Sequence, residues 1–346
     1  MKKDIHKLLR NNLKNRDPYT SARDEFTEAA EIWLDANENP FENGSNRYPD
    51  PRQHKLKEVV SRVKLVPKEN VFVGNGSDEV LDLIFRAFCE PRLDNVIITK
   101  PTYGMYQVLA EVNDVDSREA NLNEDYSLNV QNILDLTDKH TKLIFLCSPN
   151  NPTGNTLEAK AIEKLLKATT SLVVIDEAYI DFSEKESFLT KLNQYPRLTV
   201  VQTLSKAWGM AGLRLGLGFA SREIVSILDG IKPPYNVNSN SQLQAIKRLT
   251  NPNETRKQLK LIVKEKEKMR QALEQLPRVK KIFPSDANFL LVQIDGASEI
   301  YKALLKNGIV VRNRSGILFC DECLRITIGT PAENKRLIDT LQKITR

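Results

Sequence analysis

Short apolar runs alternate along the chain with stretches in which apolar residues recur every three or four positions. The runs are typical of buried strands, and the stretches are typical of helices that cover a sheet with one face. Strands are expected over residues 71–73, 96–99, 143–147, 172–175 and 215–219, with a further strand ending at residues 200–201. Helices are expected over residues 53–63, 79–88, 157–168 and 221–228. This alternation predicts an α/β fold with a mostly parallel sheet between helices.

The C-terminal third of the chain has a different pattern. A long amphipathic helix is expected over residues 254–276, where Pro277 stops it. Strands then follow over residues 289–294, 309–312 and 324–328, and helices over residues 297–306 and 332–344. The chain therefore divides into an N-terminal arm that packs with the small domain (1–34), a large ligand-binding domain (35–240) and a small α+β C-terminal domain (241–346). Near its start the arm has the pattern of a short amphipathic helix around Ile5, Leu8 and Leu9.

Polar motifs follow four of the expected strands. They occupy residues 74–79, 101–106, 148–154 and 176–179. Ligands of parallel sheets bind at the carboxyl ends of the strands, and all four motifs fall at such ends. The sequence therefore predicts one site at this edge of the large sheet.

The first of these motifs, Gly-Asn-Gly-Ser-Asp-Glu over residues 74–79, joins a strand to a helix. A glycine turn at a helix start is an anion site, because unpaired N–H groups and the positive end of the helix dipole point at the turn. It is neither GxGxxG nor GxxxxGK[ST], so a dinucleotide or a nucleoside triphosphate is a poor candidate. The charge of Asp78 would repel an anion.

Lys206 lies in a short connection between two expected strands, flanked by Ser205 and Arg214. An ammonium group is costly to bury, so this position favours a lowered pKa, and a neutral amine can attack a carbonyl to form a Schiff base. Ser205 and Arg214 stand at spacings that suit a phosphate. A lysine on a surface loop is the alternative, and Lys206 alone does not decide between the two.

Composition limits the remaining classes of function. Of 346 residues, 40% are hydrophobic and 28% charged, and the net charge is +6. The lysines and arginines are spread along the chain and interleaved with aspartates and glutamates. We therefore expect a solvated surface and no nucleic-acid partner. No apolar run is long enough to span a membrane, and the N-terminus has no apolar signal core, so a cytoplasmic protein is expected. The cysteine pair Cys320 and Cys323 lacks further ligands for zinc, so no metal is expected.

Three motifs follow one another in a characteristic order: Asn-Asn-Pro-Thr-Gly (150–154), Asp-Glu-Ala-Tyr (176–179) and Ser-Lys-Ala-Trp-Gly-Met-Ala-Gly-Leu-Arg (205–214). Together they resemble the aspartate-aminotransferase-like superfamily of fold type I, whose cofactor is pyridoxal 5'-phosphate (PLP). Within it, residues 47–50, 74–79, 101–106 and 324–327 resemble the histidinol-phosphate aminotransferase family. The resemblance runs from about Tyr19 to the last helix. It implies a seven-stranded, mostly parallel sheet in the large domain.

The resemblance also implies the residues that bind the cofactor and the substrate. Lys206 would be the catalytic residue, which forms the resting imine and moves the proton. The cofactor would be held by Tyr48 of the other subunit, Gly76, Ser77, Asp78, Tyr103, Asn151, Asp176, Tyr179, Ser205, Lys206 and Arg214. The substrate would contact Tyr19, Asn37, Arg312 and Arg325. Asp176 would face the ring nitrogen, Tyr103 would stack on the ring, and Asn151 and Tyr179 would bind its phenolic oxygen.

Four of these side chains also have a purely structural interpretation. Tyr103 could be a core aromatic, Asp176 a cap after a strand, Tyr19 a packing residue of the arm and Arg312 a member of a surface ion pair. For the whole chain, the resemblance implies a homodimer with shared active sites that transfers an amino group between L-histidinol phosphate and 2-oxoglutarate. Threonine-phosphate decarboxylase and a broad or aromatic aminotransferase are the rival enzymes. A PLP-sensing regulatory module is the non-enzymatic alternative.

Overall fold

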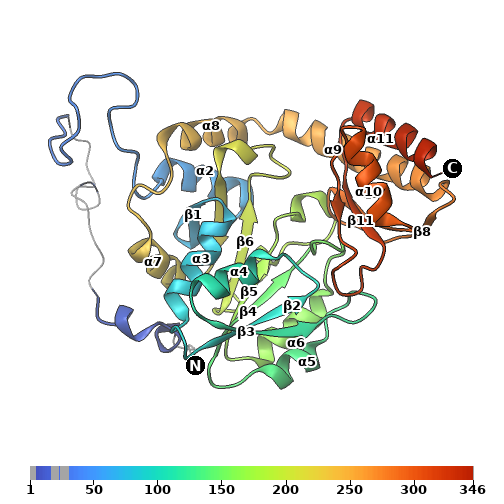
Figure 1. Cartoon of the computed structure of the whole chain (residues 1–346). Helices are drawn as coiled ribbons and strands as arrows, with labels where there is room; N and C mark the ends of the chain where they lie inside the picture. The colour runs from blue at the N-terminus through green and yellow to red at the C-terminus, as the bar shows by residue number, and fades with distance from the viewer. Residues whose placement is uncertain (1–4, 17–22, 24–30, 346) are drawn as a thin grey trace.

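The computed structural model describes residues 5–16, 23 and 31–345, and a seven-stranded sheet forms the centre of its larger domain (Figure 1). The strands lie in the order β1-β7-β6-β5-β4-β2-β3. Their bounds are β1 (Val71–Asn75), β2 (Asn95–Lys100), β3 (Asp116–Asn121), β4 (Thr141–Cys147), β5 (Leu172–Asp176), β6 (Leu198–Thr203) and β7 (Leu215–Phe219). Only β7 runs antiparallel to its neighbours, so the prediction of a mostly parallel sheet is confirmed.

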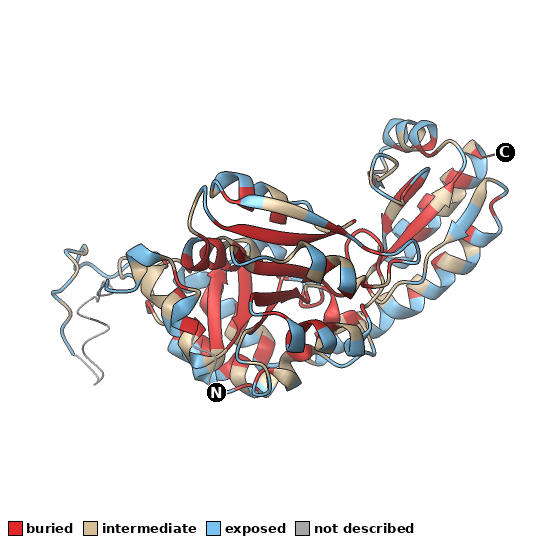
Figure 2. Ribbon diagram, turned by 90° about the horizontal axis from the view of Figure 1, so that it is seen from below, coloured by how far each residue is buried: buried red, intermediate tan, exposed pale blue. Residues whose placement is uncertain are grey.

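Helices cover both faces of this sheet, because neighbouring strand residues point to opposite sides. Val71 and Val73 belong to one apolar cluster and Phe72 to the other. The first cluster lies under α2 (His54–Lys64), α5 (Val130–Leu136), α6 (Ala159–Ala168) and α8 (Ser239–Thr250). The second lies under α3 (Ser77–Phe88), α4 (Met105–Val112) and α7 (Arg222–Ile231). Every residue of β5 and β6 is consequently buried (Figure 2).

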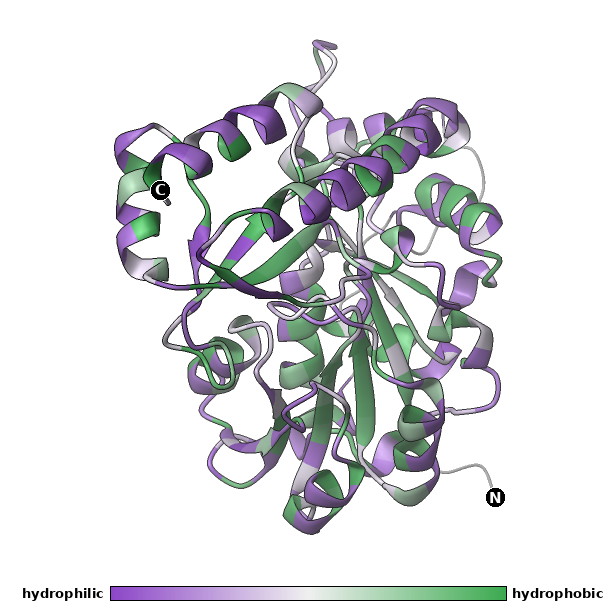
Figure 3. Ribbon diagram, turned by 90° about the vertical axis from the view of Figure 1, so that its right-hand side faces the viewer, coloured by the Kyte–Doolittle hydropathy of each residue, from purple (hydrophilic) through white to green (hydrophobic). Residues whose placement is uncertain are grey.

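The C-terminal domain is an antiparallel sheet with helices on one side. Its strands lie in the order β10-β11-β9-β8. The elements are α9 (Asn253–Glu274), β8 (Val279–Ile282), β9 (Phe289–Ile294), α10 (Ala297–Lys306), β10 (Arg312–Asn313), β11 (Cys323–Thr327) and α11 (Pro331–Ile344). Figure 3 shows hydrophilic residues along the outer faces of the helices and hydrophobic residues along the strands of the large sheet. β10 has only two residues, whereas the sequence predicts a strand over residues 309–312.

The two faces of this small sheet pack against different parts of the molecule. Leu324 and Ile326 contact the cluster that α9, α10 and α11 cover. Cys323, Phe289 and Leu291 point the other way, into the cluster shared with the large domain. Side chains that alternate with Leu324 therefore face the large domain, and Arg325 is one of them.

The start of the chain packs on the large domain, whereas the sequence predicts packing with the small domain. Ile5 and Leu9 are buried in the cluster under α3 and α7, and the Arg10 N–H donates to the Ala87 carbonyl at 3.0 Å. Two 3-10 turns, Ile5–Lys7 and Asn11–Leu13, stand where a short helix is predicted. At the other border, α8 packs on α2, so the large domain extends about one helix beyond residue 240.

Membrane-spanning helices and metal-binding clusters were looked for in the part of the chain that the structure describes. None of its helices combines the length and the apolar character that crossing a bilayer requires. The same residues contain no group of three histidine, cysteine, aspartate or glutamate side chains placed to hold a metal ion. Cys320 and Cys323 are buried free thiols, and burial raises the pKa of both.

Candidate active site

Lys206 lies in a cavity of about 140 Å³ at the carboxyl ends of β5 and β6. The cavity is lined by Ser77, Asp78, Tyr103, Cys147, Asn151, Asp176, Ala178, Tyr179, Thr203, Ser205, Lys206 and Arg214. Nine of the residues predicted to bind the cofactor thus lie together in this cavity, although they follow different strands in the sequence. The Lys206 side chain is exposed at this cavity, and its Nζ lies 5.8 Å from the centre of the Tyr179 ring.

The protein around Lys206 lowers the pKa of its amine, in the direction that the sequence predicts. Loss of water around the amine is the largest cause, and the positive charge of Arg325 follows. The carboxylates of Asp176 and Asp78 oppose the shift. A lowered pKa increases the neutral fraction of the amine, which is the form that can take up a proton or attack a carbonyl.

Asp176 ends β5 and is held in place by two donors. The Tyr106 hydroxyl donates to Asp176 Oδ2 at 2.8 Å, and the Ala178 N–H donates to Oδ1 at 3.0 Å. Burial raises the pKa of Asp176 from 3.8 to about 6, and both hydrogen bonds pull it back. Asp176 can therefore stay ionised at neutral pH beside a cationic partner. Tyr106 was not predicted as a site residue, although it lies three positions after Tyr103 in the same motif.

The glycine turn before α3 forms an anion cradle with Arg214. Gly76 has a φ of 87° and precedes the first helical residue, Ser77, and no side chain caps the helix. A Cβ on Gly76 would lie 2.7 Å from Arg214 Nη2, so only glycine lets the guanidinium close over the turn. Asp78 does not leave the cradle negative, because Arg214 Nη2 lies 3.8 Å from it and the Tyr103 hydroxyl donates to it at 3.2 Å.

Arg325 enters the site from the C-terminal domain. Its Nη1 donates to Asn151 Oδ1, and its guanidinium lies over the Phe289 ring at 5.2 Å. Phe289 in turn meets Tyr179 edge-on at 5.2 Å between ring centres. Burial raises the pKa of Tyr179 to about 12, and the charge of Arg325 counteracts this shift. Arg312 is exposed and stands opposite Arg325 on β10, outside the lining of the Lys206 cavity.

Residues 15–341 match the family model described as aminotransferase class I and II. The chain is 52% identical over 343 residues to histidinol-phosphate aminotransferase of Christiangramia forsetii, which covers 99% of this chain and 98% of that relative. The corresponding enzyme of Flavobacterium johnsoniae is 50% identical over 342 residues, 98% of each chain. The chain belongs to the class I and II aminotransferase family.

Solved structures of this fold carry more than one chemistry. Histidinol-phosphate aminotransferase of Clostridium acetobutylicum aligns with a TM-score of 0.80 at 24% identity, over 86% of this chain and 90% of that one. L-threonine-O-3-phosphate decarboxylase of Porphyromonas gingivalis aligns with a TM-score of 0.73, also at 24% identity, over 86% and 90% of the two chains. These neighbours confirm the fold type I architecture. The fold alone therefore does not distinguish amino-group transfer from decarboxylation, and the residues of the site must do so.

The aminotransferase site fits PLP, the cofactor of this family. The cradle at Gly76 and Ser77 suits its phosphate, and the buried carboxylate of Asp176 suits a protonated ring nitrogen. Lys206 supplies an amine in the same cavity. The chain is therefore a PLP-dependent aminotransferase.

Among the predicted site residues that the structure describes, five do not line the Lys206 cavity: Gly76, Arg312, Arg325, Tyr48 and Asn37. Tyr19 lies outside the described residues. Tyr48 is 50% exposed and stacks on Tyr235, with ring centres 4.3 Å apart. Asn37 is exposed and lines, with Tyr48, a different cavity near the start of α8.

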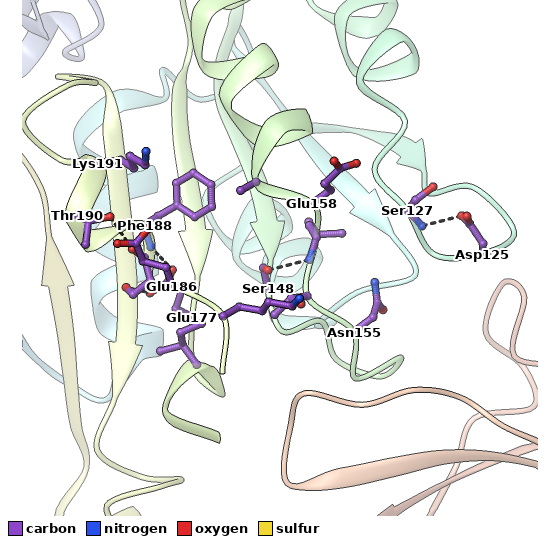
Figure 4. Close-up of a pocket in the computed structure, with 16 residues that line it drawn as sticks. Asp125, Ser127, Ser148, Asn155, Glu158, Glu177, Glu186, Phe188, Thr190 and Lys191 are labelled. Atoms are coloured by element: carbon purple, nitrogen blue, oxygen red, sulfur yellow. Dashed lines mark hydrogen bonds between the residues drawn. The ribbon is translucent and has the colours of Figure 1, made fainter. Parts of the chain in front are cut away.

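A larger cavity of about 530 Å³ opens beside the site, and neither Lys206 nor Asp176 is among the residues that line it (Figure 4). Glu177, which directly follows Asp176, lines it. The Glu177 carboxylate accepts hydrogen bonds from the Ser187 hydroxyl and the Phe188 N–H, so it is engaged in holding the segment after β5. In the same cavity the Leu157 N–H donates to Ser148 Oγ at 3.0 Å. The aminotransferase chemistry therefore belongs to the smaller cavity.

Proposed function

We propose that this aminotransferase moves an amino group between L-histidinol phosphate and 2-oxoglutarate, giving imidazole acetol phosphate and L-glutamate in histidine biosynthesis. Curated enzymes of that name share half of its residues over nearly the whole chain. The structural observation that carries the proposal is Arg325, a half-buried guanidinium at the edge of the Lys206 cavity. It pairs with an amide, Asn151, and with no carboxylate among the described residues, so its charge is available to an anionic substrate.

When bound, PLP supplies an electron sink that makes the hydrogen on the substrate carbon acidic. Asp176 would hold the proton on the ring nitrogen, because its ionised carboxylate would attract that positive charge. Lys206 Nζ would serve as the base and acid that moves the proton of the substrate carbon, which its lowered pKa permits. The Tyr179 hydroxyl, with its raised pKa, stays protonated and would hold the cofactor as a hydrogen-bond donor.

The two half-reactions bring different anionic groups to the site, a phosphate in one and a carboxylate in the other. L-Histidinol phosphate has no carboxylate, so its phosphate occupies the place that the glutamate carboxylate takes in the other half-reaction. Arg325 is placed to bind both, because its second guanidinium nitrogen and its Nε remain free of described partners. A bidentate contact from an arginine suits both anions.

A product assay separates this proposal from its rivals. The purified holoenzyme is given L-histidinol phosphate with 2-oxoglutarate, and threonine phosphate in a parallel reaction. We expect L-glutamate in the first and no carbon dioxide in the second. Carbon dioxide from threonine phosphate would favour the lyase, and equal turnover of phenylalanine and L-histidinol phosphate would favour a broad aminotransferase.

We also propose a homodimer with shared active sites. Residues 31–50 form a loop that projects from the body of the molecule (Figure 1). Leu34 and Phe41 on this loop are 86% and 80% exposed, which a partner subunit would cover. Tyr48 and Asn37 lie on the same loop and would reach the partner's site. The four cysteines are unpaired, as in a reducing compartment, which supports action in the cytoplasm.

A further inference from the structure

Three arginines lie on one face of the β10–β11 hairpin. Arg312 stands directly opposite Arg325 in the antiparallel ladder. The Arg314 N–H donates to the Cys323 carbonyl at 2.8 Å, so the ladder continues one residue beyond β10. Because side chains alternate along a strand, Arg312 and Arg314 share the face of Arg325 and Cys323. This is the face that packs toward the large domain.

The three positive charges have no matching negative charges. None of these arginines forms an ion pair with a carboxylate in the part of the chain that the structure describes. The Nε atoms of Arg314 and Arg325 are buried and have no hydrogen-bond acceptor. Like charges directly across a ladder destabilise a sheet, and a buried donor without a partner costs free energy. A bound anion would remove both penalties.

Arg314 is close enough to the site to affect its charges. Burial, then the charges of Arg325 and Arg312, lower the pKa of Arg314. The charge of Arg314, after that of Arg325, in turn acts to lower the pKa of Tyr179. Arg312 is exposed at the start of the hairpin, where water screens its charge, whereas Arg314 is half-buried. Of the two, Arg314 is the better placed to act on a substrate beside Arg325.

We propose that Arg314 is a further substrate-binding residue, which with Arg325 binds the phosphate dianion of the phosphorylated substrate. This assignment rests on the proposed function, because only the phosphorylated substrate brings a second negative charge to the pocket. Arg325 alone matches a monoanionic carboxylate. The added guanidinium stabilises the dianion selectively, and this makes Arg314 a specificity residue between the two half-reactions.

The test uses holoenzyme carrying Arg314→Met, with Arg314→Lys and Arg222→Met as comparisons. Arg222 is an exposed arginine at the start of α7 and controls for the loss of one positive charge. The kcat/KM of each half-reaction is measured in single turnovers, with L-histidinol phosphate and with L-glutamate. We expect Arg314→Met to lower the value for L-histidinol phosphate by about ten- to hundredfold and that for L-glutamate by less than about threefold. Arg314→Lys should fall between, and Arg222→Met should match the wild type.

Calorimetric titration of the same holoenzymes with inorganic phosphate gives a second reading that needs no turnover. The proposal expects weaker phosphate binding in Arg314→Met than in Arg222→Met. If the wild type does not use L-histidinol phosphate, the proposed function fails, and the phosphate titration still decides the role of Arg314. Equal losses for both substrates, or unchanged phosphate binding, would overturn the assignment.

Discussion

Asp176 shows how a single residue exchanges stability for function. Burial raises its pKa from 3.8 to about 6, so between these values the folded apoprotein binds more protons than the unfolded chain. The stability of the apoprotein therefore falls as the pH rises through this window, and the full penalty is present above it. Asp176→Asn removes the charge. We expect the variant apoprotein to be more stable than the wild type by roughly 2–3 kcal/mol near pH ~8, and by little near pH ~4.

Urea unfolding of the two apoproteins across this pH range measures the difference. Asp116→Asn, at an exposed position on the edge strand β3, is the control for losing one carboxylate at the surface. The stabilised variant should bind PLP far more weakly, because it cannot hold a proton on the ring nitrogen by charge. A variant that is less stable than the wild type at the higher pH would contradict the buried-charge account.

Single residues were predictable where a motif fixes the chemistry. Lys206 and Asp176 belong to short motifs, and the structure brings both to one cavity. Tyr106 and Arg314 were missed for a physical reason. The Tyr106 hydroxyl meets Asp176 only because α4 packs on the sheet, and the face of Arg314 depends on the register of β10 with β11. Contacts of this kind come from tertiary packing, which local spacing does not encode.

At the scale of elements, the anion cradle depends on the close approach of β7 to the turn after β1. A Cβ on Gly216 would lie 2.2 Å from the backbone carbon of Gly76 and the backbone nitrogen of Ser77. Gly216→Ala must therefore push the cradle out of place. We expect at least a tenfold loss of PLP affinity and a loss of stability of about 2 kcal/mol or more.

Gly212, in the 3-10 turn just before β7, provides a matched control. A Cβ there would meet nothing within 4 Å, so Gly212→Ala should change stability by no more than about 0.5 kcal/mol. Fluorescence titration of the apoproteins with PLP and thermal unfolding compare the two variants. If Gly216→Ala binds PLP as the wild type does, the cradle does not depend on this contact.

Elements with a strong apolar pattern were predicted, and those without one were missed. β4, β5 and α9 stand where the sequence places them, within a few residues. β3 has the sequence DSREAN, in which only Ala120 is buried, because it lies at the sheet edge. α8 was also missed, since two of its four buried residues, Ser241 and Gln242, are polar. Hydrophobic periodicity in a sequence reflects which residues are buried, so elements at the edge of the fold have a weak periodic pattern.

At the scale of the whole molecule, the proposed dimer predicts complementation between two impaired variants. Tyr48→Phe keeps the ring that stacks on Tyr235 and removes only the hydroxyl. Lys206→Ala keeps Tyr48 and removes the catalytic amine. In a mixed dimer, one site would combine Lys206 from the first subunit with Tyr48 from the second. We expect mixing to restore up to half of the activity per dimer that contains both chains.

The assay follows L-glutamate formation after the variants are mixed, unfolded and refolded together. Tyr48→Phe alone should lose about tenfold or more in PLP affinity, the scale of a hydrogen bond to a charged group. Each variant refolded alone is the control. Activity of the mixture equal to the sum of the separate variants would show that Tyr48 does not act across an interface. Full activity in a monomer would exclude the shared site altogether.

The central claim is that Lys206 holds the cofactor and moves the proton, and covalent mapping tests it most directly. Borohydride reduction of the holoenzyme fixes PLP to the amine that carries it, and mass spectrometry of the digested protein locates the label. We predict a single labelled peptide containing Lys206, no label in Lys206→Ala, and a loss of at least about a hundredfold in that variant's transamination rate. A label on another lysine, or wild-type turnover by Lys206→Ala, would contradict the account.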